Sequence, residues 1–259
     1  MTTVETLHDS TPRSVGPLPH SRTLRTVWVI AFGSMALSMP LYSYLAFNSG
    51  LDRHTLSDVM ALHVLVSLVG IFAAFLPLPS MRSWTSYQRI QGVVLPFLVF
   101  SYVSHLTWEL AWVILHKPIA HARDSAWAYS WWIYIDGGDL RYLHASPEML
   151  MSESLSAVNA LIGVIGLVLL FRSRFRDYRG TLLVMSTAVV HTVLTYAYYG
   201  AEFIAGMPSV NTSRFMDVGV RFILLNLPWI IVPPLVLGWG YVTLKAQFTS
   251  AATDDTGGH

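Results

Sequence analysis

The sequence contains no cysteine, so neither disulfide bonds nor thiol chemistry is available to it, and this absence gives no information about the compartment. Charged residues are also scarce: they make up 12% of the 259 residues, whereas hydrophobic residues make up 53%. This composition excludes an ordinary soluble domain and indicates a polytopic membrane protein. The net charge of +1 gives no reason to expect a nucleic-acid partner.

Histidine clusters, internal repeats and low-complexity domains are absent as well. The sequence has no HxxxH or HxxHH pattern, such as membrane di-iron oxygenases need, and His63 and His191 stand alone in separate apolar segments. His105 and Glu109 have a spacing that can ligate a metal, but without clustered histidines this is the weaker interpretation. We therefore expect no metal site.

Six apolar segments are each close to the ~20 residues that a helix needs to cross a bilayer. Residues 1–22 and 246–259 are polar and are predicted to be disordered tails, and residues 23–83 are predicted to hold two N-terminal transmembrane helices. The sequence thus predicts an all-α, polytopic helical bundle with spans at residues 26–47, 59–78, 92–115, 154–171, 181–204 and 218–244.

The basic residues predict how these helices cross the membrane. Ten of the 16 fall before the first segment, after the last, or in the loops that follow the second and fourth segments, which all lie on one side. The positive-inside rule assigns this side, with both termini, to the cytoplasm. The membrane would be the plasma membrane of a bacterium or the endoplasmic reticulum of a eukaryote.

The third segment carries an ionisable pair. His105 and Glu109 lie four residues apart and so share one helix face. Ionisable groups at membrane depth usually face a protein interior or a wet cavity and suggest a functional site. The structural alternative is a hydrogen-bonded pair that fixes helix packing.

Other polar groups are expected at a similar depth. At 1.5 Å per residue, His105 and Glu109 lie about 16 and 10 Å below the outer end of their segment. Glu153 opens the fourth segment at the outer surface, and Asn226 and Trp229 lie about 12–17 Å down the sixth. Each has a structural alternative: a helix-start residue favoured by the dipole, a link between two helices, or a lipid-facing ring. Because polar groups are costly in a membrane, we expect these residues to enclose one cavity.

The outer loop at residues 116–152 is long and aromatic. One interpretation is an aromatic belt on an interfacial segment, and the other is a lid over the cavity. A single segment can be both. Its aromatic residues are Trp127, Tyr129, Trp131, Trp132, Tyr134 and Tyr142.

Four stretches, in order, resemble motifs of one family. HLTWE at residues 105–109 resembles an HxxxE motif, and WIYIDGGDLRYLH at residues 132–144 resembles a W…GDxRY segment. Glu153 stands where the family has a second glutamate, and NLPWIIVP at residues 226–233 resembles NxxWxxxP. Over residues 84–245 the chain therefore resembles the emopamil-binding protein family, the EXPERA-domain sterol Δ8–Δ7 isomerases.

The resemblance implies five helices around a sterol cavity and no cofactor. It also implies that His105, Glu109 and Glu153 handle protons, that Asn226 orients one of them by a hydrogen bond, and that Trp229 faces a carbocation. The residues expected to bind the substrate are Trp108, Trp132, Asp139, Arg141, Tyr142, Ser156 and Tyr196.

The chain also departs from the family. It has one helix more, at residues 26–47, which we expect to pack outside the five-helix core. Its C-terminus, TDDTGGH, has no basic retrieval signal. Residues expected along the cavity, such as Thr107, need not match a sterol enzyme. These departures leave the substrate and the compartment open.

The first functional expectation is an isomerase that shifts a carbon–carbon double bond in a sterol or related terpenoid. This chemistry needs a neutral acid and a nearby base, an aromatic face that stabilises a cation by about 2 kcal/mol, and a dry cavity. The second is a terpenoid cyclase with the same groups, and the third is a binding protein for sterols or other membrane lipids. The sequence leaves the oligomeric state open, a homodimer included.

Overall fold

The structure of the protein is a computed structural model that describes residues 15–137 and 139–256, with side chains up to residue 249. No β-strand occurs in these residues, and the fold is all-α, as predicted. Six helices are long and apolar enough to cross a membrane, which confirms the predicted number of spans and an integral membrane protein. They are Arg22–Asn48, Arg53–Phe75, Ser86–His121, Pro147–Arg172, Tyr178–Ile204 and Met216–Thr249.

Several of these spans consist of more than one helical element. The α-helices are α1 (Arg22–Asn48), α2 (Arg53–Val69), α3 (Ser86–Ser104), α4 (Leu110–His121), α5 (Tyr129–Asp136), α6 (Arg141–His144), α7 (Pro147–Arg172), α8 (Tyr178–Ile204) and α9 (Pro228–Thr256). Two π-helices lie within spans, η3 (His105–Glu109) and η5 (Met216–Leu224). Short 3₁₀ helices are η1 (Gly70–Phe75), η2 (Pro79–Met81) and η4 (Ala126–Ala128).

Polar caps extend the helices beyond the apolar segments that predicted them. The Ser21 side chain accepts a hydrogen bond from the Leu24 amide and so starts α1 at Arg22. Thr85 and Gln88 form a reciprocal capping box at the start of α3. Because such caps satisfy the free amides of the first helical turn, each helix begins several residues before its apolar run.

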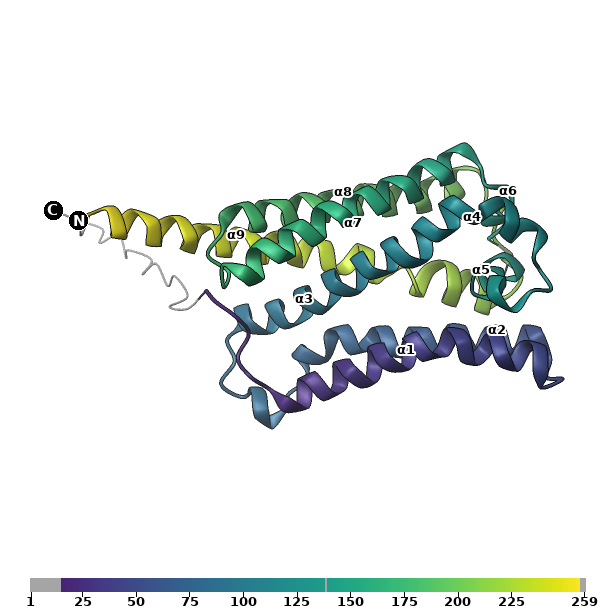
Figure 1. The fold of residues 1–259 in the computed structure, drawn as a ribbon, viewed down its shortest axis with the longest axis horizontal. Helices are drawn as coiled ribbons and strands as arrows, with labels where there is room; N and C mark the ends of the chain where they lie inside the picture. Colours follow the sequence, from purple (N-terminus) through teal and green to yellow (C-terminus); the bar gives the residue numbers. More distant parts are fainter. Residues whose placement is uncertain (1–14, 138, 257–259) are drawn as a thin grey trace, which may run out of the picture.

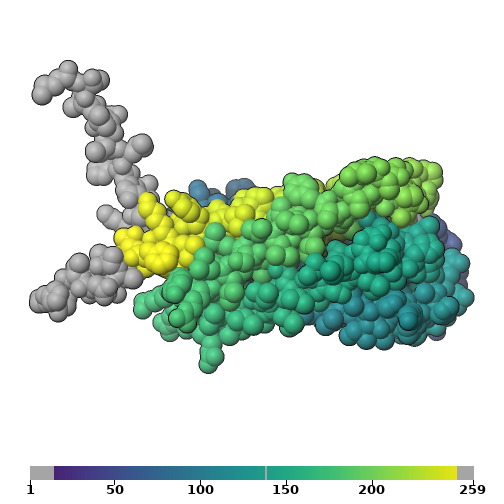
Figure 2. Space-filling view, turned by 90° about the horizontal axis from the view of Figure 1, so that it is seen from above, coloured from purple at the N-terminus to yellow at the C-terminus, as the bar shows by residue number. Residues whose placement is uncertain are grey.

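The bundle has two parts that meet at α3 (Figure 1). α1 packs against α2, whereas α8 packs against both α7 and α9. α3 contacts η1 on one side and α7 and α9 on the other. The short helices α5 and α6 lie at the end opposite to the start of α1 (Figure 1). α7, α8 and α9 make up much of the face seen in Figure 2, and the segment that precedes α7 occupies part of one end.

Two glycines of α7 allow its neighbours to approach closely. A Cβ at Gly163 would collide with the ring of Tyr102 from α3, and a Cβ at Gly166 would lie 3.2 Å from the Gly180 carbonyl oxygen of α8. Small residues at helix contacts let backbones approach in membranes as well as in soluble proteins. This packing brings α7, and with it Glu153, against the helix that carries His105.

The predicted tails differ from the structure where the structure describes them. Residues 246–256 continue α9 instead of forming a disordered tail. They include three alanines and Gln247 and have no glycine or proline before residue 257, so nothing in this stretch breaks the helix. At the other end, the Gln91 side chain donates a hydrogen bond to the Gly16 carbonyl. The remaining residues of the two predicted tails, 1–14 and 257–259, lie outside the described residues.

Candidate active site

A cavity of about 1000 Å³ lies between the two parts of the bundle. Its wall includes side chains from α1, α2, α3, η3, α5, α6, α7 and α8. The residues that precede and open α9 complete it. All five residues expected to be catalytic line this cavity: His105, Glu109, Glu153, Asn226 and Trp229.

The π-helix η3 presents the first two of these residues. At its end the Leu110 amide donates to the His105 carbonyl, five residues back, and this wider turn interrupts the α-helical path of α3 into α4. π-bulges of this kind frequently occur at functional sites. His105 Nδ1 contacts Glu109 Oε2 directly; the histidine side chain is buried and that of Glu109 is 13% exposed.

Glu153 enters from α7 and faces this pair. Its helix begins at Pro147, so Glu153 lies about 9 Å into the helix at 1.5 Å per residue, and not at its start as predicted. The Tyr142 hydroxyl donates to Glu153 Oε1 at 2.9 Å. The Glu153 and Glu109 carboxyl groups lie close enough to interact. Two such carboxyl groups repel when both are ionised, so the pair is suited to hold one proton between them.

Tyr142 is a dependable donor in this arrangement. Burial raises the pKa of Tyr142 well above its usual value, and the negative charge of Glu153 adds to this effect. The phenol therefore keeps its proton throughout the physiological range. Its hydroxyl satisfies one oxygen of Glu153 and leaves the other for a ligand or for Glu109.

Ser101 connects the histidine to the tryptophan. The Trp229 indole donates to Ser101 Oγ at 2.8 Å, and the same oxygen lies 2.9 Å from His105 Nε2. The indole is a donor only, whereas the serine hydroxyl can both donate and accept, so it can match either tautomer of His105. Since Nδ1 of the same ring contacts Glu109, a proton can pass between Glu109 and Ser101 through His105.

His191 is a site residue that the sequence did not assign. It comes from α8, and its ring centroid lies 5.0 Å from that of His105. Its Nε2 lies 3.4 Å from Ser101 Oγ, and its buried Nδ1 has no hydrogen-bond partner among the described residues. Ser101 lies one turn before His105 on the same helix, a spacing that the sequence shows. His191 is brought in only by the packing of α8.

Aromatic rings surround the acidic groups. The Trp229 ring lies 6.0 Å from the His105 ring and 5.7 Å from that of Phe100. At the end of the cavity near α5 and α6, Trp108 packs with its ring centroid 5.4 Å from those of both Tyr134 and Tyr142. These rings offer several faces to a cation and give this part of the cavity an apolar wall.

The aromatic loop at residues 116–152 folds over the cavity. Ser130, Ile133, Tyr134 and Tyr142 of this loop line its wall. Trp131 is buried, whereas Trp127 is 51% exposed. The segment thus covers one end of the cavity, as the lid interpretation expects, while its relation to a membrane interface stays a prediction.

Four of the residues expected to bind the substrate lie outside the cavity. Trp132 of α5 packs against α4, where its indole donates a hydrogen bond to the Ile119 carbonyl at 2.9 Å. Tyr196 faces outward from α8 and is 60% exposed. Asp139 and Arg141 instead bind each other. Of the expected substrate-binding residues, the cavity is lined by Trp108, Tyr142 and Ser156.

Asp139 and Arg141 form a clamp between α6 and α8. The Arg141 guanidinium binds both oxygens of Asp139 and donates to the Tyr198 carbonyl, and the Tyr198 hydroxyl donates to Asp139 at 2.6 Å. Burial opposes the charge of Arg141, but its hydrogen bonds to Asp139 outweigh this, so its pKa is raised above the usual value. This clamp fixes the loop that holds Tyr142 over Glu153.

Asn226 has a different role from the one that the resemblance implies. Its side-chain amide donates to the carbonyls of Phe222 and Arg221, at 2.9 and 3.3 Å, and not to a glutamate. It thereby caps the end of η5, where the π-helix leaves carbonyl groups unpaired. Asn226 still lines the cavity, but its bonds fix the backbone that leads to Trp229.

The N-terminal helix also departs from expectation. Residues 26–47 were expected to pack outside the core, but Trp28, Phe32 and Met35 of α1 line the cavity. The Phe32 ring stacks on Phe100 of α3 with a centroid distance of 5.9 Å. The expectation was wrong because it rested on motif positions, whereas a cavity wall needs only apolar side chains of suitable size.

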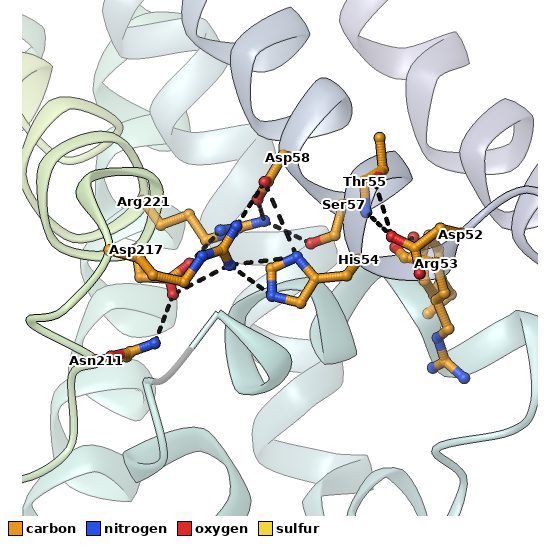
Figure 3. A network of polar contacts seen from close by, with 11 residues as sticks. Asp52, Arg53, His54, Thr55, Ser57, Asp58, Asn211, Asp217 and Arg221 are labelled. Atoms are coloured by element: carbon orange, nitrogen blue, oxygen red, sulfur yellow. Dashed lines mark hydrogen bonds and ion pairs between the residues drawn. The ribbon is translucent and has the colours of Figure 1, made fainter.

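A second polar cluster joins α2 to η5 (Figure 3). Arg221 donates to Asp58 at 2.8 Å and to Ser57 at 2.7 Å and pairs with Asp217, while Arg214 binds the other oxygen of Asp58 at 2.9 Å. Arg221 and Asp217 are buried. The charges in this cluster balance, and none of these residues lines the cavity. The cluster therefore anchors the π-helix that precedes Trp229.

No arrangement that could hold a metal ion, with three or more His, Asp or Glu side chains, occurs in residues 15–137 and 139–249. The site therefore presents proton-carrying groups, aromatic faces and an apolar wall. No protein-family model and no solved structure matches the chain.

Proposed function

We propose that the protein is an intramembrane isomerase that shifts a carbon–carbon double bond in a sterol or a related polycyclic terpenoid, without a cofactor. The observation that carries this proposal is the pair of carboxyl groups, Glu109 and Glu153, which face one apolar cavity from two helices. Each has its own partner, His105 or Tyr142. The resemblance to the EXPERA-domain isomerases supports the same reaction.

The reaction balances without any oxidant or reductant. One carboxyl group gives its proton to an alkene carbon, and the alkene electron pair forms the new carbon–hydrogen bond. The tertiary cation that results lies beside the Trp229 ring, which stabilises it. The other carboxylate removes a proton from a neighbouring carbon, and the electrons of that bond form the shifted alkene. The proton then returns between the two carboxyl groups.

A terpenoid cyclase is the second candidate, and the size and aromatic wall of the cavity favour keeping it. A volume of about 1000 Å³ is at the upper end of the range for small-molecule pockets. Rings of Trp108, Tyr134 and Phe100 extend the aromatic wall beyond Trp229. A cyclase would protonate a linear polyprene or its epoxide and yield new rings, so the two candidates differ in the substrate that they convert.

The orientation in the membrane belongs to this proposal. Both termini face the cytoplasm, because the loops with most basic residues then lie inside. The carboxyl pair then lies in the outer half of the membrane, below the lid formed by α5 and α6. Substrate and product stay within the bilayer in this arrangement.

The proposal is tested by turnover with the purified full chain. The chain is treated with a chelator, dialysed, and incubated with a Δ8-sterol in detergent micelles, and the products are separated by gas chromatography and mass spectrometry. We expect an isomer of unchanged mass with a shifted double bond. A linear polyprene converted in place of the sterol would favour the cyclase, and tight binding without conversion of either would contradict both.

A further inference from the structure

The cavity is longer than the chemistry at the carboxyl pair requires. α7 lines the cavity near both of its ends, at Glu153 and at Phe171, which lie about 27 Å apart along the helix at 1.5 Å per residue. This distance is close to the ~30 Å hydrocarbon thickness of a bilayer. The part of the cavity between Phe171 and Ser101 is here called the inner arm. None of the proton-carrying side chains at the carboxyl pair lies in it.

The wall of the inner arm differs in character from the reactive end. Its side chains are apolar and come from α1, the loop before α3, α3 itself and the end of α7: Leu24, Trp28, Trp84, Leu95, Val99 and Phe171. Polar lining residues reappear only at the far end, with Ser21 and Arg25. A wall of this kind binds linear apolar groups by burial and offers them no directional partner.

α1 makes this arm and also leaves it open at the side. Helix α1 packs on α2 and η1, but it has no comparable contact with α7, α8 or α9. Val99 and Val103 of α3 line the cavity and are nevertheless 45% and 54% exposed. Because α1 and α3 are not among the closely packed helix pairs, the cavity wall is incompletely covered between them.

We infer that the ligand carries an extended apolar chain, and that this chain lies in the inner arm along α1 while the reacting ring lies at Glu109 and Glu153. This inference rests on the proposed function for the position of the ring. The chemical class is a membrane-resident terpenoid with a polycyclic end and a linear tail, which enters sideways between α1 and α3. A compact ring system without a tail would leave the inner arm unfilled.

Photolabelling locates the tail independently of turnover. The probe is a Δ8-sterol with a diazirine at the end of its side chain, applied to the full chain, and a matched probe carries the diazirine on the ring system. We expect the tail probe to label α1 or residues 84–99, and the ring probe to label η3 or α7 near Glu153, both displaced by excess unlabelled sterol. Tail labelling in α5 or α6, or labelling that is not displaced, would overturn the inference.

A plug in the inner arm gives a second test. Val99→Trp fills the arm, and Ile30→Trp is its control, because Ile30 lies outside the cavity wall and is 64% exposed. We expect Val99→Trp to reduce displaceable tail labelling by at least about tenfold. Keeping only two methylene groups of the tail out of the inner arm would already weaken binding by about this factor. Ile30→Trp should label as the wild type does. Equal labelling of the two variants would overturn the inference, whereas absence of isomerised product from the wild type would count against the proposed function alone.

Discussion

Each carboxyl group in the cavity has a different partner, and this difference gives the two groups different tasks. Glu109 contacts His105, which passes a proton on to Ser101 and, through it, reaches His191. Glu153 accepts from Tyr142, which donates a hydrogen bond but takes no part in proton storage. Glu109 can therefore be reprotonated along this hydrogen-bonded chain, whereas Glu153 receives its proton from Glu109.

Replacement of either carboxyl group should abolish most of the activity. Glu109→Gln and Glu153→Gln keep the size and polarity of the side chain but cannot carry the proton. A general acid or base typically contributes about 10²–10⁴-fold, so each variant should lose at least about 100-fold in kcat. Glu148→Gln is the matched control, because Glu148 is exposed in the first turn of α7, the helix that carries Glu153. Near-normal turnover by both cavity variants would remove the carboxyl pair from the mechanism.

The hydroxyl of Tyr142 can be tested alone. Tyr142→Phe keeps the ring that packs on Trp108 and removes the donor to Glu153. Loss of a hydrogen bond to a charged group costs about 1.5–3 kcal/mol, so turnover should fall by about tenfold or more. Tyr241→Phe, at a tyrosine that is 66% exposed on α9, should stay within about twofold. If Tyr142→Phe behaves like this control, the hydroxyl does not serve Glu153.

At the residue scale the sequence predicted the acidic groups but not all their partners. The spacing of His105 and Glu109 follows from helix periodicity, and Ser101 extends the same face by one turn. His191 is different, because only the packing of α8 against α3 brings it to Ser101. Arg141 and Asp139 bind each other and so do not line the cavity, which a sequence motif does not reveal.

Two π-helices distinguish the elements that build the site. η3 turns His105 and Glu109 inward in the middle of a span, and η5 leads from the charged cluster to Trp229. Hydropathy predicts the spans but is insensitive to such a local change in winding. Neither π-helix was therefore predicted, although hydropathy predicted the two membrane spans that contain them.

The cluster that anchors η5 should contribute strongly to stability. The Asp217 side chain is 0% exposed and pairs with Arg221, so Asp217→Asn removes one of the two carboxylates that pair with this buried guanidinium and leaves only Asp58. Removing one member of a buried pair costs about 3–5 kcal/mol. Asp124→Asn is the control, because Asp124 is 92% exposed in its pair with Arg53 and should change stability by no more than about 1 kcal/mol. The two are compared by thermal unfolding in the same detergent, and equal melting temperatures would refute the anchoring role.

For the whole molecule, composition was sufficient to predict an all-α bundle with six spans. It did not predict that α1 forms part of the cavity wall, because apolar side chains that face lipid and those that face a cavity are alike in sequence. The close approach of α7 to α3 and α8 depends on Gly163 and Gly166, whose function appears only when their neighbours are known.

The proposed topology is tested with reporter fusions along the chain. Fusions after Arg179 and Lys245 should report the cytoplasm, and a fusion within residues 122–130 should report the outer side, because basic loops stay inside. The control is a fusion after Arg82, which should agree with Arg179. If the reporter at Arg179 lies outside, the orientation of the bundle is the reverse of the proposed one, and the carboxyl pair lies in the inner half of the membrane.

The most direct measurement follows a proton from solvent into the product. Wild-type protein, Glu109→Gln and Glu153→Gln are each incubated with a Δ8-sterol in deuterated water, and the product is analysed by NMR and mass spectrometry. The account predicts a shifted alkene with a single deuterium on the newly protonated carbon from the wild type, and almost none from either variant. The same amount of deuterated product from either variant as from the wild type would contradict protonation by the Glu109–Glu153 pair.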